Sequence, residues 1–223
     1  MEIWLDTIDL DVIADGAKTG VISGVTTNPS ILSRSKNVQE TIARILDLQP
    51  GPVAVQVTGQ TPEQILEEAR HLNEQSNRLI IKIPLVRNGL IAMKQLRQEN
   101  IPILGTAILY PTQALLAANQ NIAYIAPYFC HMGDIGNAFE SLKTMVDLLR
   151  ATQSQTKILV ASLRQMDQLL YCASLGVHAV TIKPDLYAKL MAEQPVVEGF
   201  LQKFLSEWRQ AHGSLSIKDA VTL

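Results

Sequence analysis

One lysine stands inside the short apolar run Leu79-Ile80-Ile81-Lys82-Ile83-Pro84. Aliphatic runs of this length are typical of a strand that is buried on both faces in a parallel sheet. Burial disfavours the ammonium form and lowers the pKa of a lysine, so that the neutral amine is available closer to neutral pH. A neutral lysine can form a Schiff base with a carbonyl substrate. The alternative is a structural lysine whose methylene stem carries its charge out to water.

Polar residues follow the other apolar runs in the same way. The sequence predicts eight strands, at Ile3–Leu5, Val21–Thr26, Val53–Val57, Leu79–Ile83, Ile101–Gly105, Ile122–Ala126, Lys157–Ala161 and Val177–Ile182. Near the C-terminal ends of these strands stand, in order, Asp6, Thr26 to Asn28, Gln56, Lys82, Thr106, Tyr128, Ser162, and Thr181 or Lys183. Taken singly, Asp6 and Asn28 are common turn residues and Thr106 could cap a helix. Their recurrence around one buried lysine predicts a shared site for a carbonyl substrate.

The segments between the predicted strands have helical spacing. In the segment 61–73, Thr61 is a candidate N-cap before Pro62, and Gly176 is a candidate helix stop further along the chain. Alternating strands and helices predict an α/β fold, a TIM (β/α)₈ barrel in preference to an open doubly wound sheet. We expect one domain over residues 1–223, with an additional helix at about 195–211 that docks on the barrel or on another subunit.

Composition excludes several classes of protein. Hydrophobic residues make up 47% of the chain and charged residues 18%. The formal net charge is −2, and the sequence has no basic tail. Nucleic acid and membrane surfaces are therefore not expected partners. Cys130 and Cys172 have no CxxC spacing, which argues against a disulfide framework or a zinc site. With no nucleotide motif, no metal motif and no signal-peptide pattern, we expect a cytoplasmic protein without a cofactor.

These residue types are sufficient for aldol chemistry. Lys82 would attack a ketone and lose water to form an imine, which acidifies the neighbouring carbon and permits an enamine. Protons would move through a water held by Gln56, Thr106 and Tyr128. Asp6 and Asn28 could hold the hydroxyl groups of a polyol donor.

Beyond this chemistry, the sequence resembles a known family over nearly its whole length. The segments that carry the resemblance are Leu5-Asp6-Thr7, Gly24-Val25-Thr26-Thr27-Asn28-Pro29-Ser30, Lys82-Ile83-Pro84, Gly105-Thr106-Ala107, Ala126-Pro127-Tyr128 and Ala161-Ser162. They resemble the transaldolase family, in particular its small subfamily, and within it the fructose-6-phosphate aldolases. The resemblance implies a TIM barrel, a metal-free class I aldolase mechanism and Lys82 as the Schiff-base residue.

The resemblance also implies an assembly and a reaction type. Small members of the family form ring-shaped homo-oligomers, decamers or pentamers, in which the C-terminal helix lies across a neighbour. Transaldolases carry a glutamate where this chain has Gln56 and a phenylalanine where it has Tyr128. The pair of Gln56 and Tyr128 is therefore the aldolase pattern, in which the tyrosine handles protons through the water.

One position departs from the family pattern. Relatives carry a phosphate-binding arginine two to three residues after the tyrosine, and this chain has His131 there. A neutral imidazole holds a phosphate less well than a guanidinium fork. Ser162 and Arg164 could contribute to binding, together with Thr26 and Asn28 elsewhere in the site. Lys183 is a further cation without a counterpart in the pattern.

The leading interpretation is a class I aldolase that reversibly cleaves fructose 6-phosphate, or a related sugar, to dihydroxyacetone and an aldehyde. A transaldolase that transfers the same three-carbon unit between sugar phosphates is the alternative within this chemistry. A barrel that binds a sugar without catalysis is a third possibility, but it would need neither the lysine nor the proton relay. A barrel isomerase with a carboxylate base would want a glutamate at a strand end, and the sequence has none there.

Overall fold

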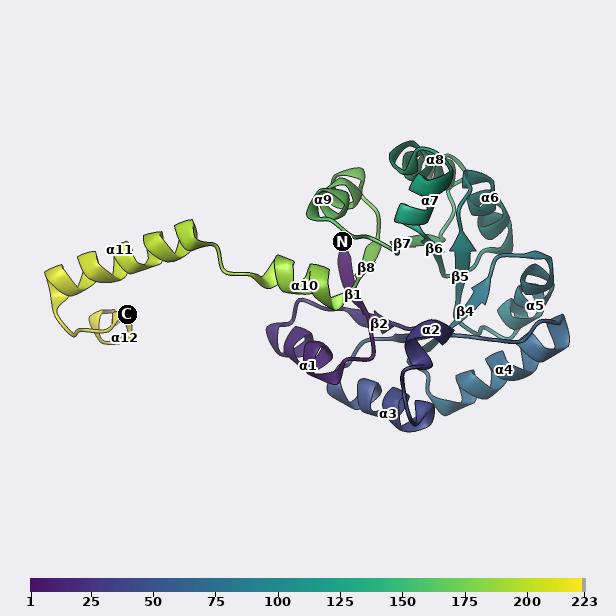
Figure 1. Ribbon diagram of the computed structural model, residues 1–223, viewed down its shortest axis with the longest axis horizontal. Coiled ribbons are helices and arrows are strands. Elements are labelled where there is room, and N and C mark those ends of the chain that lie inside the picture. Colours follow the sequence, from purple (N-terminus) through teal and green to yellow (C-terminus); the bar gives the residue numbers. More distant parts are fainter. Residues whose placement is uncertain (222–223) are drawn as a thin grey trace. The chain divides into compact units, whose positions relative to one another are not determined.

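The computed structural model describes residues 1–221, and its strands close into an eight-stranded parallel barrel in the order β1 to β8 (Figure 1). The strands are β1 (Glu2–Asp6), β2 (Gly24–Thr26), β3 (Val53–Gln56), β4 (Leu79–Pro84), β5 (Ile103–Ile108), β6 (Tyr124–Pro127), β7 (Lys157–Val160) and β8 (Ala179–Ile182). Closure is made by parallel pairing of β1 with β8, in which Leu5 stands opposite Ile182. The predicted (β/α)₈ barrel is confirmed.

Contacts divide the chain into two compact units, Met1–Tyr187 and a second unit that begins at Ala188. The first unit holds the barrel, with α1 (Leu10–Thr19), α2 (Pro29–Leu32), α3 (Val38–Leu48), α4 (Pro62–Gln75), α5 (Arg87–Gln98), α6 (Pro111–Gln120), α7 (Phe129–Ile135), α8 (Ala138–Ala151) and α9 (Met166–Leu175). Helix α10 (Pro184–Met191) crosses the boundary between the units. In the first unit the helices surround the strands, with α4 packed against α5 and α6 against α8 (Figure 1).

Two sequence signals mark helix ends as predicted. Thr61 accepts a hydrogen bond from the backbone N–H of Gln64 at 3.3 Å, and the Gln64 side chain completes a capping box at the start of α4. Helix α9 ends at Gly176, whose φ of 75° lies in the left-handed region that glycine adopts readily. These local signals fix where the connecting helices begin and end, and therefore where each following strand enters the barrel.

Strands β5 and β6 start later than the apolar runs suggested. The predicted run 101–105 begins at Ile101, but β5 begins at Ile103, and β6 begins at Tyr124 instead of Ile122. Both Ile101 and Ile122 are buried, at 7% and 3% exposure, although each lies in a loop before its strand. The apolar pattern therefore predicted strand starts that are two residues too early, because the loops before these strands also contribute buried side chains to the core.

Seven buried residues form one apolar cluster inside the barrel. They are Trp4, Ala54, Ile80, Leu104, Ala126, Leu159 and Ala179, with Tyr124 and Ala161 packed against them. Each of the seven comes from a different strand, and only β2, which places Gly24 beside the Trp4 ring, adds no side chain. We call these seven residues the apolar layer, because they fill the barrel interior as packed side chains do in this fold.

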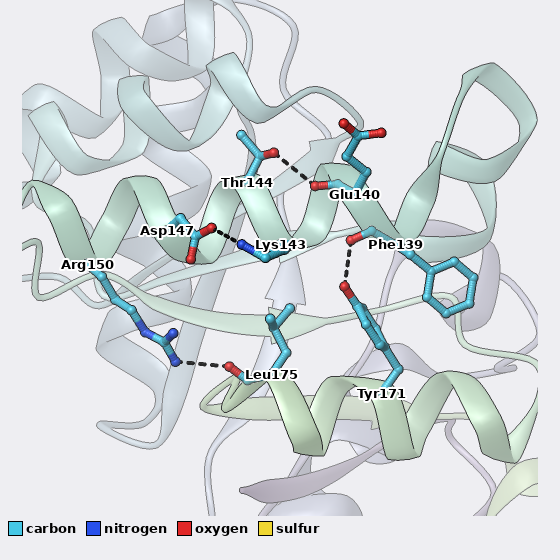
Figure 2. A network of polar contacts seen from close by, with 8 residues as sticks. All are labelled: Phe139, Glu140, Lys143, Thr144, Asp147, Arg150, Tyr171 and Leu175. Atoms are coloured by element: carbon cyan, nitrogen blue, oxygen red, sulfur yellow. Dashed lines mark hydrogen bonds and ion pairs between the residues drawn. The ribbon is translucent and has the colours of Figure 1, made fainter.

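Helices α8 and α9, which flank β7 in the sequence, are joined by a polar and aromatic network (Figure 2). The Tyr171 hydroxyl donates to the Phe139 carbonyl oxygen at 2.8 Å, and the two rings meet edge to face at 4.8 Å. Further along, Arg150 donates to the Leu175 carbonyl oxygen at 2.9 Å. These contacts tie α9 to both ends of α8.

The second unit contains α11 (Pro195–His212) and α12 (Ile217–Ala220). Helix α11 is the helix predicted at about 195–211. The rings of Phe200 and Phe204 in α11 stack at 6.4 Å, and the Trp208 indole donates to the carbonyl oxygen of Leu215, which follows the helix, at 2.6 Å. Docking of this helix on the barrel or on another subunit stays a prediction.

Candidate active site

A second ring of residues lies two positions after the apolar layer on the same strands. In the order of the strands these residues are Asp6, Gln56, Lys82, Thr106, Tyr128, Ala161 and Thr181. Alternate residues of a strand face the same side, so both sets point toward the barrel axis. We call these seven residues the polar layer, although Ala161 is apolar. It lies toward the C-terminal ends of the strands, where active sites of this fold form.

All residues of the polar layer except Thr106 line a cavity of about 520 Å³, a size suited to a small metabolite. Its lining residues are Asp6, Thr26, Asn28, Pro29, Ser30, Gln56, Lys82, Leu104, Ala126, Tyr128, His131, Leu159, Ala161, Ser162, Thr181 and Lys183. Eight of the ten predicted site residues therefore line the cavity, and a ninth, Thr106, is hydrogen-bonded to Tyr128 in the lining. Arg164 lies elsewhere.

Lys82 lies deep in this cavity, between Ile81 and Ile83 on β4, and is only 4% exposed. Its ammonium donates a hydrogen bond to the Thr27 carbonyl oxygen at 2.7 Å. Burial lowers the pKa of Lys82 from 10.5 to about 8, although the nearby Asp6 carboxylate opposes the shift. About a tenth of the amine is then neutral at pH 7, which is enough for nucleophilic attack on a carbonyl.

Asp6 is held by two buried threonines. The Thr26 hydroxyl donates to the Asp6 carboxylate at 2.8 Å and lies 2.7 Å from the Thr181 hydroxyl. A hydroxyl has one proton to give, so Thr181 is the donor to Thr26. This hydrogen-bond relay comes from β2 and β8, the two strands that pair with β1, and it orients the Asp6 carboxylate. Thr26, which was predicted to bind substrate, therefore also positions Asp6.

Thr106 and Tyr128 form a second polar pair across neighbouring strands. Their hydroxyl oxygens lie 2.8 Å apart, and Thr106 is fully buried. The backbone of Tyr128 extends β6 by one parallel bridge to Ala161, which fixes the ring at the cavity wall. The suggestion that Thr106 caps a helix is wrong, because Thr106 lies inside β5, which continues to Ile108.

Gln56 is the last residue of β3 and stands opposite Lys82 in the parallel register. Its amide can donate and accept hydrogen bonds but carries no proton that titrates. At the rim, Asn28 accepts a hydrogen bond from the Ile31 N–H at 3.0 Å and so begins α2. Asn28 therefore has the turn role that its residue type suggested, and it also lines the cavity.

Ser162 and His131 meet on the opposite rim. The Ser162 hydroxyl lies 3.1 Å from Nδ1 of His131, and the His131 ring packs 5.7 Å from the ring of Tyr128. Ser162 has a φ of 63°, an unusual backbone conformation for a residue that is not glycine. Such strain is often found at functional sites, where the surrounding structure holds it in place.

Arg164 does not line the cavity. It lines a neighbouring surface hollow together with Cys130 and Asp134, and its backbone N–H donates to Gln168 at 2.8 Å in the turn before α9. The two residues that the sequence assigned least clearly, Thr181 and Lys183, do line the cavity. The strand alternation that places Thr181 inward could have selected both, had the start of β8 been known.

Within residues 1–221, no helix is long and apolar enough to cross a membrane. Across the same residues, no three His, Cys, Asp or Glu side chains are grouped as ligands of a metal ion.

The sequence of the chain matches one described family over residues 3–215, Transaldolase/Fructose-6-phosphate aldolase. A probable transaldolase of Caulobacter sp. (strain K31) is 37% identical over 212 residues, which cover 93% of this chain and 96% of the relative. A probable transaldolase of Petrotoga mobilis is 34% identical over 221 residues, covering 98% of this chain and all of the relative.

Solved structures show the same barrel at low sequence identity. A mandelate oxidase mutant superimposes with a TM-score of 0.59 at 19% identity, covering 94% of this chain and 72% of that one. A flavocytochrome b2 mutant gives a TM-score of 0.56 at 12% identity, covering 82% and 56% of the two chains. These similarities show the fold alone.

Proposed function

The chain belongs to the transaldolase/fructose-6-phosphate aldolase family, and we propose that it is a class I aldolase acting through Lys82. The substrate is fructose 6-phosphate or a related sugar, which is cleaved reversibly to dihydroxyacetone and an aldehyde. The observation that carries the proposal is the lysine amine, buried among polar side chains at the mouth of the barrel, with its pKa lowered to about 8.

The covalent step begins when the neutral Lys82 amine attacks the ketone carbon of the sugar. A carbon–nitrogen bond forms, and the former carbonyl oxygen leaves as water to give an imine. Removal of the proton from the C4 hydroxyl then breaks the C3–C4 bond, with the electron pair drawn into the imine to give an enamine. The aldehyde departs, the enamine carbon gains a proton, and water hydrolyses the imine to release dihydroxyacetone and the free amine.

Proton transfer in these steps is assigned to Tyr128. Its phenol lies at the cavity wall and is hydrogen-bonded to the buried Thr106 hydroxyl at 2.8 Å. A water held by Gln56, Thr106 and Tyr128 would carry protons between the phenol and the imine nitrogen. Asp6, oriented by Thr26, is placed to accept hydrogen bonds from the donor's hydroxyl groups and to favour the cationic imine.

Asn28, Ser162 and His131 complete the proposed substrate site. They line the same cavity and lie above the polar layer, where the hydroxyls and the phosphate of a six-carbon sugar would extend. Arg164, which was expected to bind substrate, is not part of the proposed substrate site, because it lines a different surface hollow.

A transaldolase is the second candidate, because the relatives at 34% and 37% identity are named probable transaldolases. Lys82 has the same role in both reactions. The side chains at the proton relay favour the aldolase, since the amide of Gln56 offers no carboxyl group and Tyr128 offers an acidic hydroxyl in its place. An assembly of several identical subunits and a cytoplasmic location belong to the same proposal.

Free dihydroxyacetone distinguishes the two candidates. An aldolase releases it from fructose 6-phosphate alone, whereas a transaldolase needs a second aldose phosphate, such as erythrose 4-phosphate, and releases none. We expect release without a second sugar. Transfer to erythrose 4-phosphate with no free dihydroxyacetone would support the transaldolase and overturn the aldolase.

The double variant Gln56→Glu with Tyr128→Phe should move the ratio of the two activities toward transfer. Gln60→Glu with Tyr128→Phe is the matched control, since Gln60 lies in the exposed loop after β3 and outside the cavity. An equal ratio in both double variants would show that residue 56 has no part in choosing the reaction.

A further inference from the structure

Lys183 is a charged residue of the cavity lining to which the mechanism above assigns no role. It directly follows β8, in which Thr181 lines the cavity while Ile182 is fully buried and does not line it. Alternate residues of a strand face the same side, so Lys183 continues the inward face of Thr181. Its presence in the cavity lining agrees with this direction. The side chain is exposed, in contrast to Lys82 deep in the same cavity.

In the part of the chain that the structure describes, no ion pair neutralises the charge of Lys183. Within residues 1–221, no carboxylate lies within 4.0 Å of its amine. Asp6 is the one carboxylate that lines the cavity, and its hydrogen bond from Thr26 turns it toward β2. Lys82 and Lys183 are the two cations of the lining, and only Lys183 is open to a ligand entering from solvent.

The neighbours of Lys183 are also suited to an anion. Ser162 follows β7 and His131 lies on α7, which follows β6, so the three residues come from three consecutive strands of the barrel. The Ser162 hydroxyl and Nδ1 of His131 are already within 3.1 Å of each other. Loops after the seventh and eighth strands commonly bind phosphate in this fold.

We propose that Lys183 determines the preference of this site for phosphorylated substrates by binding their terminal phosphate, with Ser162 and His131 as hydrogen-bonding partners. This inference rests on the proposed function and adds the residue that recognises the negative charge of the substrate. An ammonium on a flexible stem is a compact point charge that can follow a phosphate at the end of an open-chain sugar. His131 alone has no permanent charge for this purpose, and Arg164 lines another hollow.

The test compares Lys183→Met with Lys183→Arg and with Lys94→Met. Lys94 is exposed on the outer helix α5, so its variant has the same change in net charge away from the cavity. The measurement is KM for fructose 6-phosphate and for unphosphorylated fructose. Loss of one charge-assisted hydrogen bond should raise KM for the phosphate ester by about ten- to a hundredfold. KM for fructose should stay unchanged, because fructose has no phosphate.

Two further readouts make the test specific. Lys183→Arg should restore most of the affinity for fructose 6-phosphate, and inorganic phosphate should compete with that substrate in the wild type but not in Lys183→Met. Lys183→Gln serves as a second neutral variant. A KM ratio that stays at the wild-type value in both neutral variants overturns the proposal, and so does a ratio that changes in Arg164→Met instead.

Failure of this inference can be told apart from failure of the proposed function. Borohydride trapping of dihydroxyacetone on Lys82 does not involve a phosphate, so it should proceed equally in the wild type and in Lys183→Met. Trapping together with an unchanged KM ratio overturns the role of Lys183 alone. Absence of trapping in the wild type overturns the aldolase mechanism, and the Lys183 inference falls with it.

Discussion

The apolar layer and the polar layer of the barrel interior are separated by only two residues on each strand, yet they have opposite tasks. Ile80 and Lys82 on β4 show the contrast, since both are buried and both face the barrel axis. Ile80 packs against residues of the other strands, whereas Lys82 carries an amine whose charge is disfavoured by burial. Through its alternation alone, one strand thus supplies a core side chain at one level and, in the proposed mechanism, the nucleophile at the next.

The largest expected effect is the loss of turnover when the polar layer loses its amine in Lys82→Met. We expect turnover to fall to background, because no other buried amine lines the cavity to form the imine. Lys94→Met on the outer helix α5 should keep wild-type turnover, so the loss is not a general effect of charge. Substantial activity in Lys82→Met would assign the nucleophile to another residue.

The same variant should gain stability at pH 7. A pKa lowered from 10.5 to about 8 corresponds to about 3 kcal/mol of destabilisation by the buried charge. The unpaired Thr27 carbonyl oxygen should take back about 1 kcal/mol of the gain. Between pH 8 and 10.5 the unfolded wild type binds more protons than the folded one, so its stability rises with pH. The advantage of Lys82→Met should therefore shrink across that window, as measured by urea unfolding.

Ile80→Ala in the apolar layer should behave in the opposite way. A large-to-small change of this kind in a packed core lowers the free energy of unfolding by about 2–5 kcal/mol. The variant should still form the Schiff base at a temperature where it is folded, because Lys82 is retained. Unfolding experiments and trapping on the same sample check both parts. A stable variant that cannot be trapped would show that the two layers do not divide the tasks in this way.

Tyr128→Phe should lower the cleavage rate by about a hundredfold, the lower end of what a positioned acid–base group contributes. The matched control is Tyr124→Phe, four residues earlier on β6, where the ring packs against the apolar layer. The measurement is kcat for fructose 6-phosphate in both variants. Similar rates in the two variants would remove Tyr128 from the proton relay.

Among these changes, a shift of one pH unit should have the smallest effect. Attack on the ketone needs the neutral amine, so kcat/KM should rise about tenfold per pH unit below pH 8 and level off above it. A profile that is flat between pH 6 and 8 would contradict a buried Lys82 with a lowered pKa. The same profile in Thr106→Val would show whether the hydrogen bond to Tyr128 affects the nucleophile or only the later proton transfers.

Much of this division was predictable from the sequence, because both the strand period and the buried lysine are local patterns. The alternation around Lys82 and the polar residues at the strand ends predict the barrel and most of the cavity lining. The extent of β5 was not predictable from the same pattern, since Ile101 in the preceding loop is as apolar as the strand itself. Thr106 could be mistaken for a helix cap because the predicted strand ended at Gly105, whereas β5 continues to Ile108.

Residues after the strands were harder to place, since their directions depend on turns and not on alternation. Arg164 follows Ser162, whose left-handed backbone redirects the chain, and the adjoining turn is held by Gln168 from α9. The sequence carries no local signal for that conformation at a serine. Lys183, by contrast, continues the period of β8, so its place could be read once the register with β1 was known.

Borohydride reduction in the presence of dihydroxyacetone, followed by peptide mass spectrometry, tests the central claim most directly. Hydride adds to the imine carbon and turns a reversible Schiff base into a stable secondary amine, which marks the nucleophile. We predict a three-carbon adduct on Lys82 in the wild type and none in Lys82→Met. An adduct on a different lysine, or no adduct with this donor, would contradict the account.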